Sequence, residues 1–217
     1  MLASPLTNLA RPLEWQAFDT PIPYPGAMIM MEERVAAIRN HGAPEMVWLL
    51  EHLPCYTAGS SAKDNDVIAP GKIPLYPTGR GGQVTYHGPG QRIVYLMMDL
   101  TSRQIDIRDY VGRLQNWIIA SLADFGVNGF CREGRIGVWV EDKGRESKIA
   151  AIGIRVRRGV AFHGISVNIN PDLSAYAGII PCGIKEFGVT SLKALGKNIV
   201  MAEFDQALRR HFPRYFP

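Results

Sequence analysis

Apolar residues recur three or four positions apart in residues 25–41, which predicts an amphipathic helix. Pro25 stands near its start and Gly42 follows its end, as is typical of helix boundaries. The apolar face consists of Met28, Met31, Val35 and Ile38. A last helix is expected at residues 201–212.

A second long helix is predicted at residues 106–125. Asp106 is the expected N-cap, with Asp109 three residues later, and Gly126 is expected to end the helix. Its apolar face consists of Ile107, Val111, Leu114, Trp117, Ile118, Leu122 and Phe125.

Short apolar runs bounded by turn residues predict strands in the rest of the chain. The run at 46–51 lies between two prolines, and the run at 92–100 is continuous enough to be a central strand. Residues 55–74 are expected to form a long loop. The predicted strands are 46–51, 84–87, 92–100, 136–141, 148–157 and 160–169.

The last three of these strands are expected to form a meander, with turns at Lys143-Gly144 and Arg158-Gly159. The 22 glycines and 15 prolines favour many turns over long helices. We therefore expect an α/β fold of the α+β type, in which a mixed, largely antiparallel sheet is flanked by helices. Since no repeat or linker composition is visible, residues 1–217 are expected to form a single domain.

Composition excludes several classes of protein. The apolar run at 93–98 is closed by Arg92 and Asp99, so it is too short to span a membrane. The first residues lack the pattern of a secretory signal, so we expect a cytoplasmic location. The net charge of +4 suits an acidic partner but is a weak indicator.

The segment at 80–91, RGGQVTYHGPGQ, combines four glycines with residues that form hydrogen bonds. Its spacing matches neither common glycine-rich phosphate loop. One interpretation is a hairpin with glycines at its ends. The other is that glycine lets a substrate lie against the backbone, with Arg80 and His87 at the two ends of a cleft.

Lys148 and His163 are the polar residues to explain in the predicted meander. Lys148 shares strand parity with Ala150, Ile152 and Ile154, so it points to the apolar side. A buried ammonium is costly, which makes Lys148 a candidate base, although a lysine near a strand end also reaches water easily. His163 is more typical of a hydrogen-bonded core histidine than of a catalyst.

The chain has three cysteines and no C-x-x-C pair, so neither a disulfide framework nor a cysteine zinc site is indicated. Cys182 lies between proline and glycine, where a turn presents its thiol, and Cys55 has a similar setting. Cys131 follows Phe130 and is interpreted as core filler. A nucleophilic cysteine needs a basic neighbour, and Lys148 is the candidate for Cys182.

Three segments together resemble the lipoyl(octanoyl) transferase family. They are RGGQVTYHGPGQ at 80–91, KIAAIGIRVRRGVAFHGISVNIN at 148–170 and PCGI at 181–184, in the family's order. The resemblance covers residues 45 to 192. It implies a fold similar to the catalytic domains of biotin and lipoate protein ligases.

The resemblance also implies a reaction and its residues. An octanoyl group would move from octanoyl-acyl carrier protein to a lysine of a lipoyl domain, without ATP, cofactor or metal. The implied acceptors are the lipoyl domains of 2-oxoacid dehydrogenase complexes and the glycine cleavage H protein, with no nucleic acid or membrane partner. Cys182 would be the acyl-thioester nucleophile and Lys148 its base, while backbone N–H groups beside Cys182 and at Gly81-Gly82 are candidates for holding the oxyanion. The implied lining of the acyl site is Arg80, Gly81, Gly82, Gln83, Val84, Thr85, Tyr86, His87, Ala151, Ile152, Gly153, Gly164, Ile165 and Ser166.

Three other interpretations stay open. The same fold would suit an ATP-dependent lipoate or biotin ligase, which does not require Cys182. A cysteine hydrolase would pair Cys182 with His87 or His163. A nucleic-acid binder would use the RGG triplet and the arginines at 155, 157 and 158, although no aromatic residues alternate with them.

Overall fold

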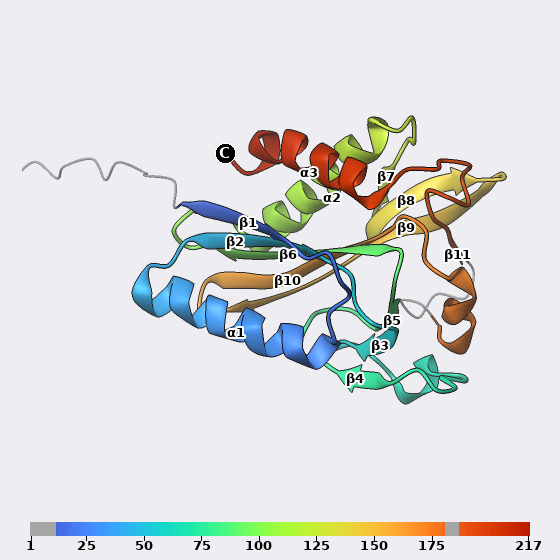
Figure 1. Cartoon of the computed structure of the whole chain (residues 1–217), viewed down its shortest axis with the longest axis horizontal. Helices are drawn as coiled ribbons and strands as arrows, with labels where there is room; N and C mark the ends of the chain where they lie inside the picture. The colour runs from blue at the N-terminus through green and yellow to red at the C-terminus, as the bar shows by residue number, and fades with distance from the viewer. Residues whose placement is uncertain (1–11, 181–186) are drawn as a thin grey trace, which may run out of the picture.

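The computed structural model describes residues 12–180 and 187–217, which form two β-sheets and three α-helices (Figure 1). The large sheet has the strand order β1-β2-β6-β10-β9-β8-β7, and β11 pairs with β9. The small sheet has the order β4-β3-β5. The large-sheet strands are β1 Leu13–Ala17, β2 Glu45–Leu50, β6 Gln91–Asp99, β7 Phe130–Arg132, β8 Arg135–Asp142, β9 Arg145–Arg157, β10 Val160–Asn168 and β11 Gly188–Val189. The small-sheet strands are β3 Cys55–Ala58, β4 Leu75–Pro77 and β5 Val84–His87.

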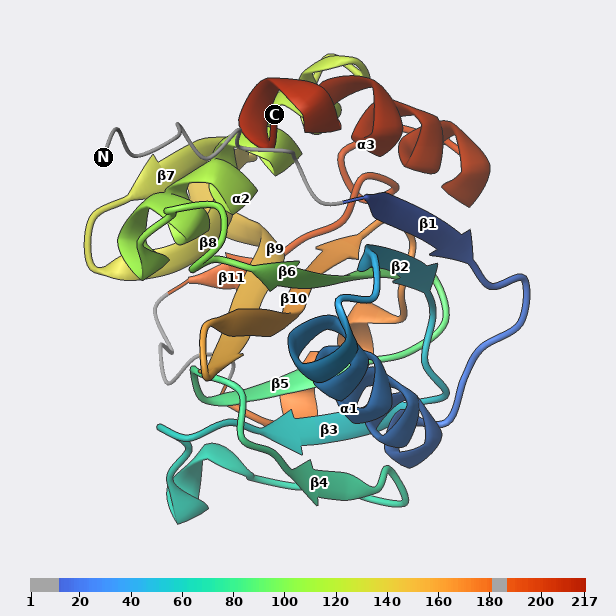
Figure 2. The ribbon, with the colours of Figure 1, turned by 90° about the vertical axis from the view of Figure 1, so that its left-hand side faces the viewer.

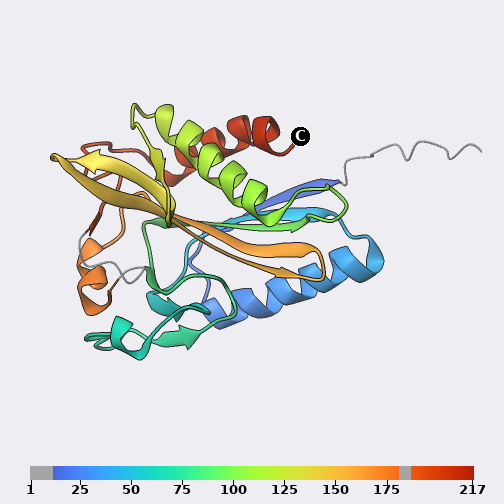
Figure 3. The ribbon, with the colours of Figure 1, turned by 180° about the vertical axis from the view of Figure 1, so that it is seen from behind.

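Helix α1, Tyr24–His41, covers one face of the large sheet (Figure 3). Its buried Met31, Val35 and Ile38 pack against apolar side chains of β2, β6 and β10. Gly42 ends the helix in a left-handed conformation, with φ of 64°. The predicted helix at 25–41 is confirmed.

Helices α2, Ile107–Ala123, and α3, Met201–Tyr215, cover the opposite face of the large sheet (Figure 2). The carboxylate of Asp106 accepts the N–H groups of Arg108 and Asp109, which confirms the predicted cap. The indole of Trp117 donates to the carbonyl oxygen of Leu208 at 2.9 Å and joins the two helices. Ile107 is the exception to the predicted apolar face, because 52% of its surface is exposed.

Strands β8, β9 and β10 form the predicted meander. Lys143 and Gly144 at the first turn, and Arg158 and Gly159 at the second, all have positive φ, which tight hairpin turns of this hand require. Strand β6 is central, between β2 and β10. The expected mixed, largely antiparallel sheet flanked by helices is confirmed.

Two expectations for the chain before β6 are wrong. Residues 55–58 form β3 rather than loop, because this segment pairs with both β4 and β5. Strands β5 and β6 are not a hairpin, since they belong to different sheets. Between them Gly90 has φ of 83°, and an added Cβ there would stand 2.2 Å from the carbonyl oxygen of Asn170. The glycines of this turn therefore carry the chain from one sheet to the other.

Among the described residues, none of the helices has the length and apolarity needed to cross a bilayer.

Candidate active site

The glycine-rich segment before β5 lies directly against the middle of β9. The N–H of Gly81 donates to the carbonyl oxygen of Ile154 at 2.8 Å. A Cβ at Gly153 would stand 3.0 Å from the Gly81 carbonyl oxygen and 3.1 Å from Cδ of Arg80. Glycine at 153 thus allows the loop to contact the strand. Because Gly81 has given its N–H to Ile154, it does not serve the oxyanion role expected from the sequence.

Arg80 is a buried cation, 8% exposed, held by carbonyl oxygens of its own loop and of β3. Its Nη2 donates to the carbonyl oxygen of Thr57 at 2.6 Å and to that of Gln83 at 2.9 Å, and its Nη1 donates to that of Gly81 at 2.9 Å. The planar fork of the guanidinium suits these diverging bonds. Arg80 therefore fixes the shape of the loop at 80–83.

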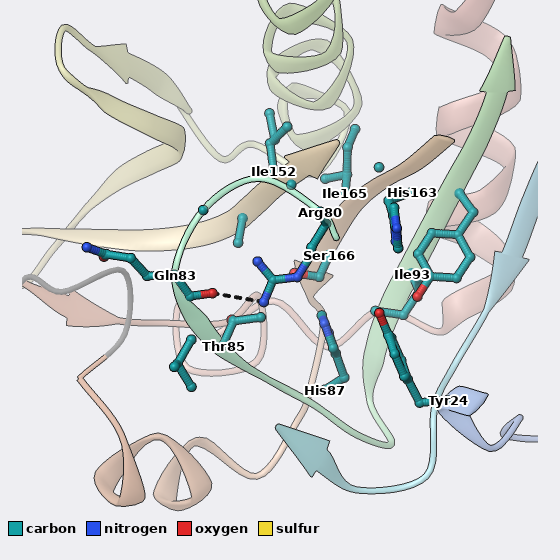
Figure 4. A pocket seen from close by; sticks show the side chains of 16 residues that line it. Tyr24, Arg80, Gln83, Thr85, His87, Ile93, Ile152, His163, Ile165 and Ser166 are labelled. Carbon is teal, nitrogen blue, oxygen red and sulfur yellow. Dashed lines mark hydrogen bonds between the residues drawn. The ribbon is translucent and has the colours of Figure 1, made fainter. Parts of the chain in front are cut away.

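A narrow cavity of about 50 Å³ lies between this loop, β9 and β10 (Figure 4). It brings together all of the expected acyl-site residues except Gly81, which lines the neighbouring groove, and Tyr86, which packs against Tyr56 and Tyr176. Sequence reasoning missed Tyr24, Ile93 and Tyr95. The lining consists of Tyr24, Arg80, Gly82, Gln83, Val84, Thr85, His87, Ile93, Tyr95, Ala151, Ile152, Gly153, His163, Gly164, Ile165 and Ser166.

A chain of hydrogen bonds fixes the tautomer of His87. The amide nitrogen of Asn168 donates to the carbonyl oxygen of Thr190 at 3.0 Å, so its oxygen accepts from Nε2 of Gln91 at 2.9 Å. The oxygen of Gln91 then accepts from Nδ1 of His87 at 2.7 Å. Nε2 of His87 accepts from the hydroxyl of Thr57 at 3.2 Å.

Electrostatics keeps His87 neutral. Burial lowers the pKa of His87 well below its ordinary value, and the nearby His52 and Arg80 lower it further. With both ring nitrogens engaged in hydrogen bonds, His87 is a wall of the cavity rather than a proton acceptor. The sequence left open whether His87 does chemistry, and this geometry favours a structural role.

His52 is a second buried histidine, which sequence reasoning missed. Its Nδ1 donates to the carbonyl oxygen of Ile22 at 2.8 Å, and its Nε2 accepts from the hydroxyl of Tyr95 at 2.7 Å. Burial lowers the pKa of His52 to about 4. The signal in the sequence was a histidine and a tyrosine within or just after otherwise apolar runs.

His163 is a core histidine, 4% exposed, but not a satisfied one. Its Nδ1 is buried without a hydrogen-bond partner among the described residues, and its backbone has φ of 63°, which is rare outside glycine. Its ring stacks on Phe162 and meets the edge of Tyr95. Burial lowers the pKa of His163 to about 3, with a further contribution from Arg80. The expected hydrogen bonding is therefore absent at Nδ1.

Lys148 is buried, with 7% of its surface exposed. Its Nζ donates to the carbonyl oxygen of Ile136 at 3.1 Å and lies 4.8 Å from the centre of the Trp139 ring. On the other side of β9, Val189 of β11 pairs with Lys148. The prediction that this side chain points inward is confirmed, and the alternative in which it reaches water is wrong.

Cys182 lies outside the described residues, as do Pro181, Gly183 and Ile184. On one side of this segment the N–H of Ile180 donates to the carbonyl oxygen of Asp66 at 2.8 Å. On the other side the ring of Phe187 meets the ring of Trp139, and β11 follows beside Lys148.

The other two cysteines differ from each other. Cys55 is buried in β3, not held in a turn, and burial raises the pKa of its thiol to about 12. Cys131 is exposed, so its interpretation as core filler is wrong. Burial of part of its side chain raises the pKa of Cys131 as well. Neither thiol is activated in the described structure.

Lys148 lines two cavities. It lines a small cavity that shares Thr85, Ala151 and Ser166 with the narrow one that holds Arg80. It also lines a groove of about 640 Å³ that opens on the side of α2. A group beside Lys148 thus has an enclosed space on one side and an open groove on the other.

The arginines near the end of β9 are committed to structure. Arg157 forms an ion pair with Glu32 at 3.0 Å, and both Arg155 and Arg157 lie over the ring of Phe162. Phe162 is 1% exposed, so it offers no platform on which a base stacks. The geometry does not support the nucleic-acid interpretation.

Comparison with known protein families and sequences gives a consistent assignment. A family model described as the lipoyl protein ligase A/B catalytic domain matches residues 23–213. A curated octanoyltransferase of Paramagnetospirillum magneticum is 56% identical over 206 residues, which cover 94% of this chain and 97% of that protein. An octanoyltransferase of Caulobacter vibrioides is 54% identical over 211 residues, which cover 95% of this chain and 93% of that protein.

Solved structures show the same fold at low sequence identity. A bi-partite lipoate protein ligase from Thermoplasma acidophilum has a TM-score of 0.72 and 16% identity, covering 94% of this chain and 83% of that one. The biotin protein ligase from Aquifex aeolicus has a TM-score of 0.54 and 12% identity, and the match covers 95% of this chain and 70% of that one. The expected similarity to these catalytic domains is confirmed at the level of fold.

Proposed function

Because this chain belongs to the lipoyl protein ligase A/B catalytic domain family and its curated relatives are octanoyltransferases, we propose that it transfers an octanoyl group through Cys182 to a lysine. The donor is the thioester of octanoyl-acyl carrier protein, and the acceptor is the ε-amine of a lysine on a lipoyl domain. The acceptors include lipoyl domains of 2-oxoacid dehydrogenase complexes and the glycine cleavage H protein. The reaction takes place in the cytoplasm.

The observation that carries the proposal is the setting of Lys148. Its amine is buried between β8 and β9, and the backbone of Lys148 pairs with β11. Strand β11 begins at Gly188, six residues after Cys182. The chain that carries the thiol therefore leads directly to the strand beside the candidate base. This short connection supports the pairing of Lys148 with Cys182.

In the first step Lys148 accepts the proton of the Cys182 thiol, and the thiolate attacks the carbonyl carbon of the donor. The bond from this carbon to the carrier sulfur breaks, and the carrier leaves as a thiol with the proton that Lys148 returns. One thioester replaces another, so the free energy changes little. No ATP is required for this exchange.

In the second step the neutral ε-amine of the acceptor attacks the Cys182 thioester. The bond from carbon to sulfur breaks, and the proton of the amine passes by way of Lys148 to the departing thiolate. Formation of an amide from a thioester is strongly favourable, which drives the transfer. The N–H of Gly82 remains the candidate in the 81–82 pair for holding the oxyanion.

The narrow cavity supplies the place for the hydrocarbon chain. Ile93, Ile152 and Ile165 give it apolar walls, and Gly153 and Gly164 leave space beside β9 and β10. Its continuity with Lys148 through Thr85 and Ser166 supports a chain that enters from the thioester. Each buried methylene contributes about 0.8 kcal/mol, so discrimination among chain lengths is gradual.

A cysteine hydrolase using His87 fits the geometry poorly, because both nitrogens of that ring are engaged and it is neutral. For His163, burial and the nearby Arg80 lower the pKa so far that this ring is a weak base. An assay of ATP dependence distinguishes the proposed transferase from an ATP-dependent ligase of the same fold.

The test is a transfer assay with purified enzyme, octanoyl-acyl carrier protein and an unmodified lipoyl domain. We expect an octanoyl amide on the domain's lysine without ATP, and no reaction from free octanoate with ATP. Modification from free octanoate that depends on ATP would instead assign a ligase. Release of free octanoate without an acceptor, at the rate of transfer, would assign a hydrolase.

A further inference from the structure

An open groove lies beside Lys148, next to the narrow cavity assigned to the acyl chain. Its walls come from the first two turns of α2, the turn between β7 and β8, the loop at 81–83 and β9. Gly82, Gln83 and Gly153 separate it from the narrow cavity, since they line both. An occupant of the groove that reaches Lys148 lies next to the small cavity that adjoins the acyl site.

One wall of the groove is an open strand edge. Strand β8 pairs with β9 as far as Val138 opposite Ala150, and no described strand covers that edge of β9 afterwards. The carbonyl oxygen of Ile154 turns to this side, where it accepts the N–H of Gly81. Alternate residues of a strand direct their backbone groups to the same side, so the N–H and C=O of Ile152 also face the groove.

The side chains around this edge are mostly apolar or basic, and Ser61 and Gln83 are the neutral polar ones. Ile107 and Ile136 are 52% and 57% exposed, which is unusual for isoleucine. Arg108 and Arg135 are cations, of which Arg135 is paired with Glu146 outside the lining, and the described lining itself contains no carboxylate. The groove thus fits an occupant with backbone-like amides, an apolar section and a negative charge.

The two arginines of the groove differ in their pairing and in their distance from Lys148. Arg135 is engaged by Glu146 and stacks on Trp139, close to Lys148. Arg108 is exposed at the outer end of the groove. Gln115 follows seven residues later on α2, and its side chain donates to the carbonyl oxygen of Gly137, next to the Ile136 carbonyl that Lys148 contacts. Seven helical residues span about 10 Å, so Arg108 stands roughly that far along α2 from the level of Lys148.

We propose that this groove binds the 4′-phosphopantetheine arm of the acyl donor, with its phosphate at Arg108 and its thioester beside Lys148. The inference rests on the proposed function and adds a recognition site to it. The arm is about as long as five extended residues, or roughly 17 Å, which spans from Lys148 to a guanidinium at the groove's outer end. Its two amides pair with the open edge at Ile152, as an added strand does.

Charge decides between the donor and the acceptor as the occupant. The acceptor approaches as a lysine side chain, which carries no negative group to pair with the arginines of the groove, Arg108 and Arg135. A phosphate is attracted by the same set, and an arginine binds it with charge-assisted hydrogen bonds. The groove therefore suits the donor better than the acceptor.

The test compares two small donors, octanoyl-4′-phosphopantetheine and octanoyl-pantetheine, which differ in the phosphate alone. Transfer to a lipoyl domain is measured as kcat/KM for the wild type, for Arg108→Gln and for Arg39→Gln. Arg39 is exposed on α1, so its substitution makes the same charge change away from the groove. A fourth protein, Val111→Trp, fills the groove from α2.

We expect the wild type and Arg39→Gln to prefer the phosphorylated donor about 10-fold, and Arg108→Gln to lower this preference to about 2-fold. Val111→Trp should raise KM for both pantetheine donors more than for octanoyl-N-acetylcysteamine, which lacks the outer part of the arm. A wild-type preference near one, or an unchanged preference in Arg108→Gln, overturns the proposal. Failure of the proposed function looks different, because no donor would then give an octanoylated lysine.

Discussion

The side-chain nitrogen of Lys148 lies 3.1 Å from the carbonyl oxygen of Ile136, across the pair of strands β8 and β9. This bond holds a buried amine between the small enclosed cavity and the open groove. A charged group in such a place is costly unless it is paired. The position suits a group that takes and returns protons.

Replacing Lys148 by alanine should leave a folded but slow enzyme. General-base catalysis contributes typically 100- to 10,000-fold, so we expect acyl-enzyme formation to slow by at least about 100-fold. The measurement is single-turnover loss of the donor thioester. Lys193→Ala, at an exposed position, is the matched control and should retain its rate. A decrease of less than about 5-fold in Lys148→Ala would remove the base from the mechanism.

Removing the ring of His163 should shift the preference toward longer acyl chains. The ring closes part of the narrow cavity, and glycine suits the backbone there because φ is 63°. In His163→Gly we expect kcat/KM for decanoyl relative to octanoyl donors to rise about 10-fold, since two methylenes contribute roughly 1.6 kcal/mol when buried. His211→Gly, on α3, tests for general loosening. An unchanged chain-length profile would place the cavity's end elsewhere.

Arg80→Lys should destabilise the protein although the charge is kept. Lysine lacks the fork that reaches Thr57, Gln83 and Gly81 together, so at least one buried carbonyl loses its donor. The free energy of unfolding should fall by about 1–3 kcal/mol. Urea denaturation measures it, and Arg34→Lys, whose ion pair is on the surface, should change it by less than about 1 kcal/mol. Equal effects would refute the bridging role.

Stability should decrease in acid because buried histidines are neutral in the folded state. The pKa of His52 is about 4 in the folded chain and about 6.5 for an ordinary histidine, so between pH 6.5 and 4 the unfolded chain binds a proton that the folded chain does not. The free energy of unfolding therefore falls as the pH drops from about 6.5 to 4 and stops falling from this cause below 4.

His52→Gln should make that dependence shallower by up to about 1.4 kcal/mol per pH unit. Denaturation at several pH values between 4 and 7 measures the slope, and His41→Gln, exposed at the end of α1, is the control. If the slope were the same in His52→Gln as in the wild type, proton uptake by His52 would not govern acid stability.

Local pattern predicted most of the large sheet and all three helices, because apolar spacing and turn residues act within short segments. It did not predict β3 or the separation of β5 from β6, which depend on pairing between distant strands. The sequence motifs identified the segment from Arg80 to His87 as part of the site. Tyr24, His52 and Tyr95 come from other elements, and only the folded chain brings their rings together.

The pairing of Lys148 with Cys182 requires that the acyl group be carried by Cys182 and by no other thiol. Intact mass and digestion after mixing the enzyme with octanoyl-acyl carrier protein, without acceptor, identify the acylated residue. One octanoyl group should appear on the peptide that contains Cys182, persist in Cys55→Ser and Cys131→Ser, and disappear with transfer in Cys182→Ser. An octanoyl group on Cys55 or Cys131, or transfer that continues in Cys182→Ser, would contradict the mechanism.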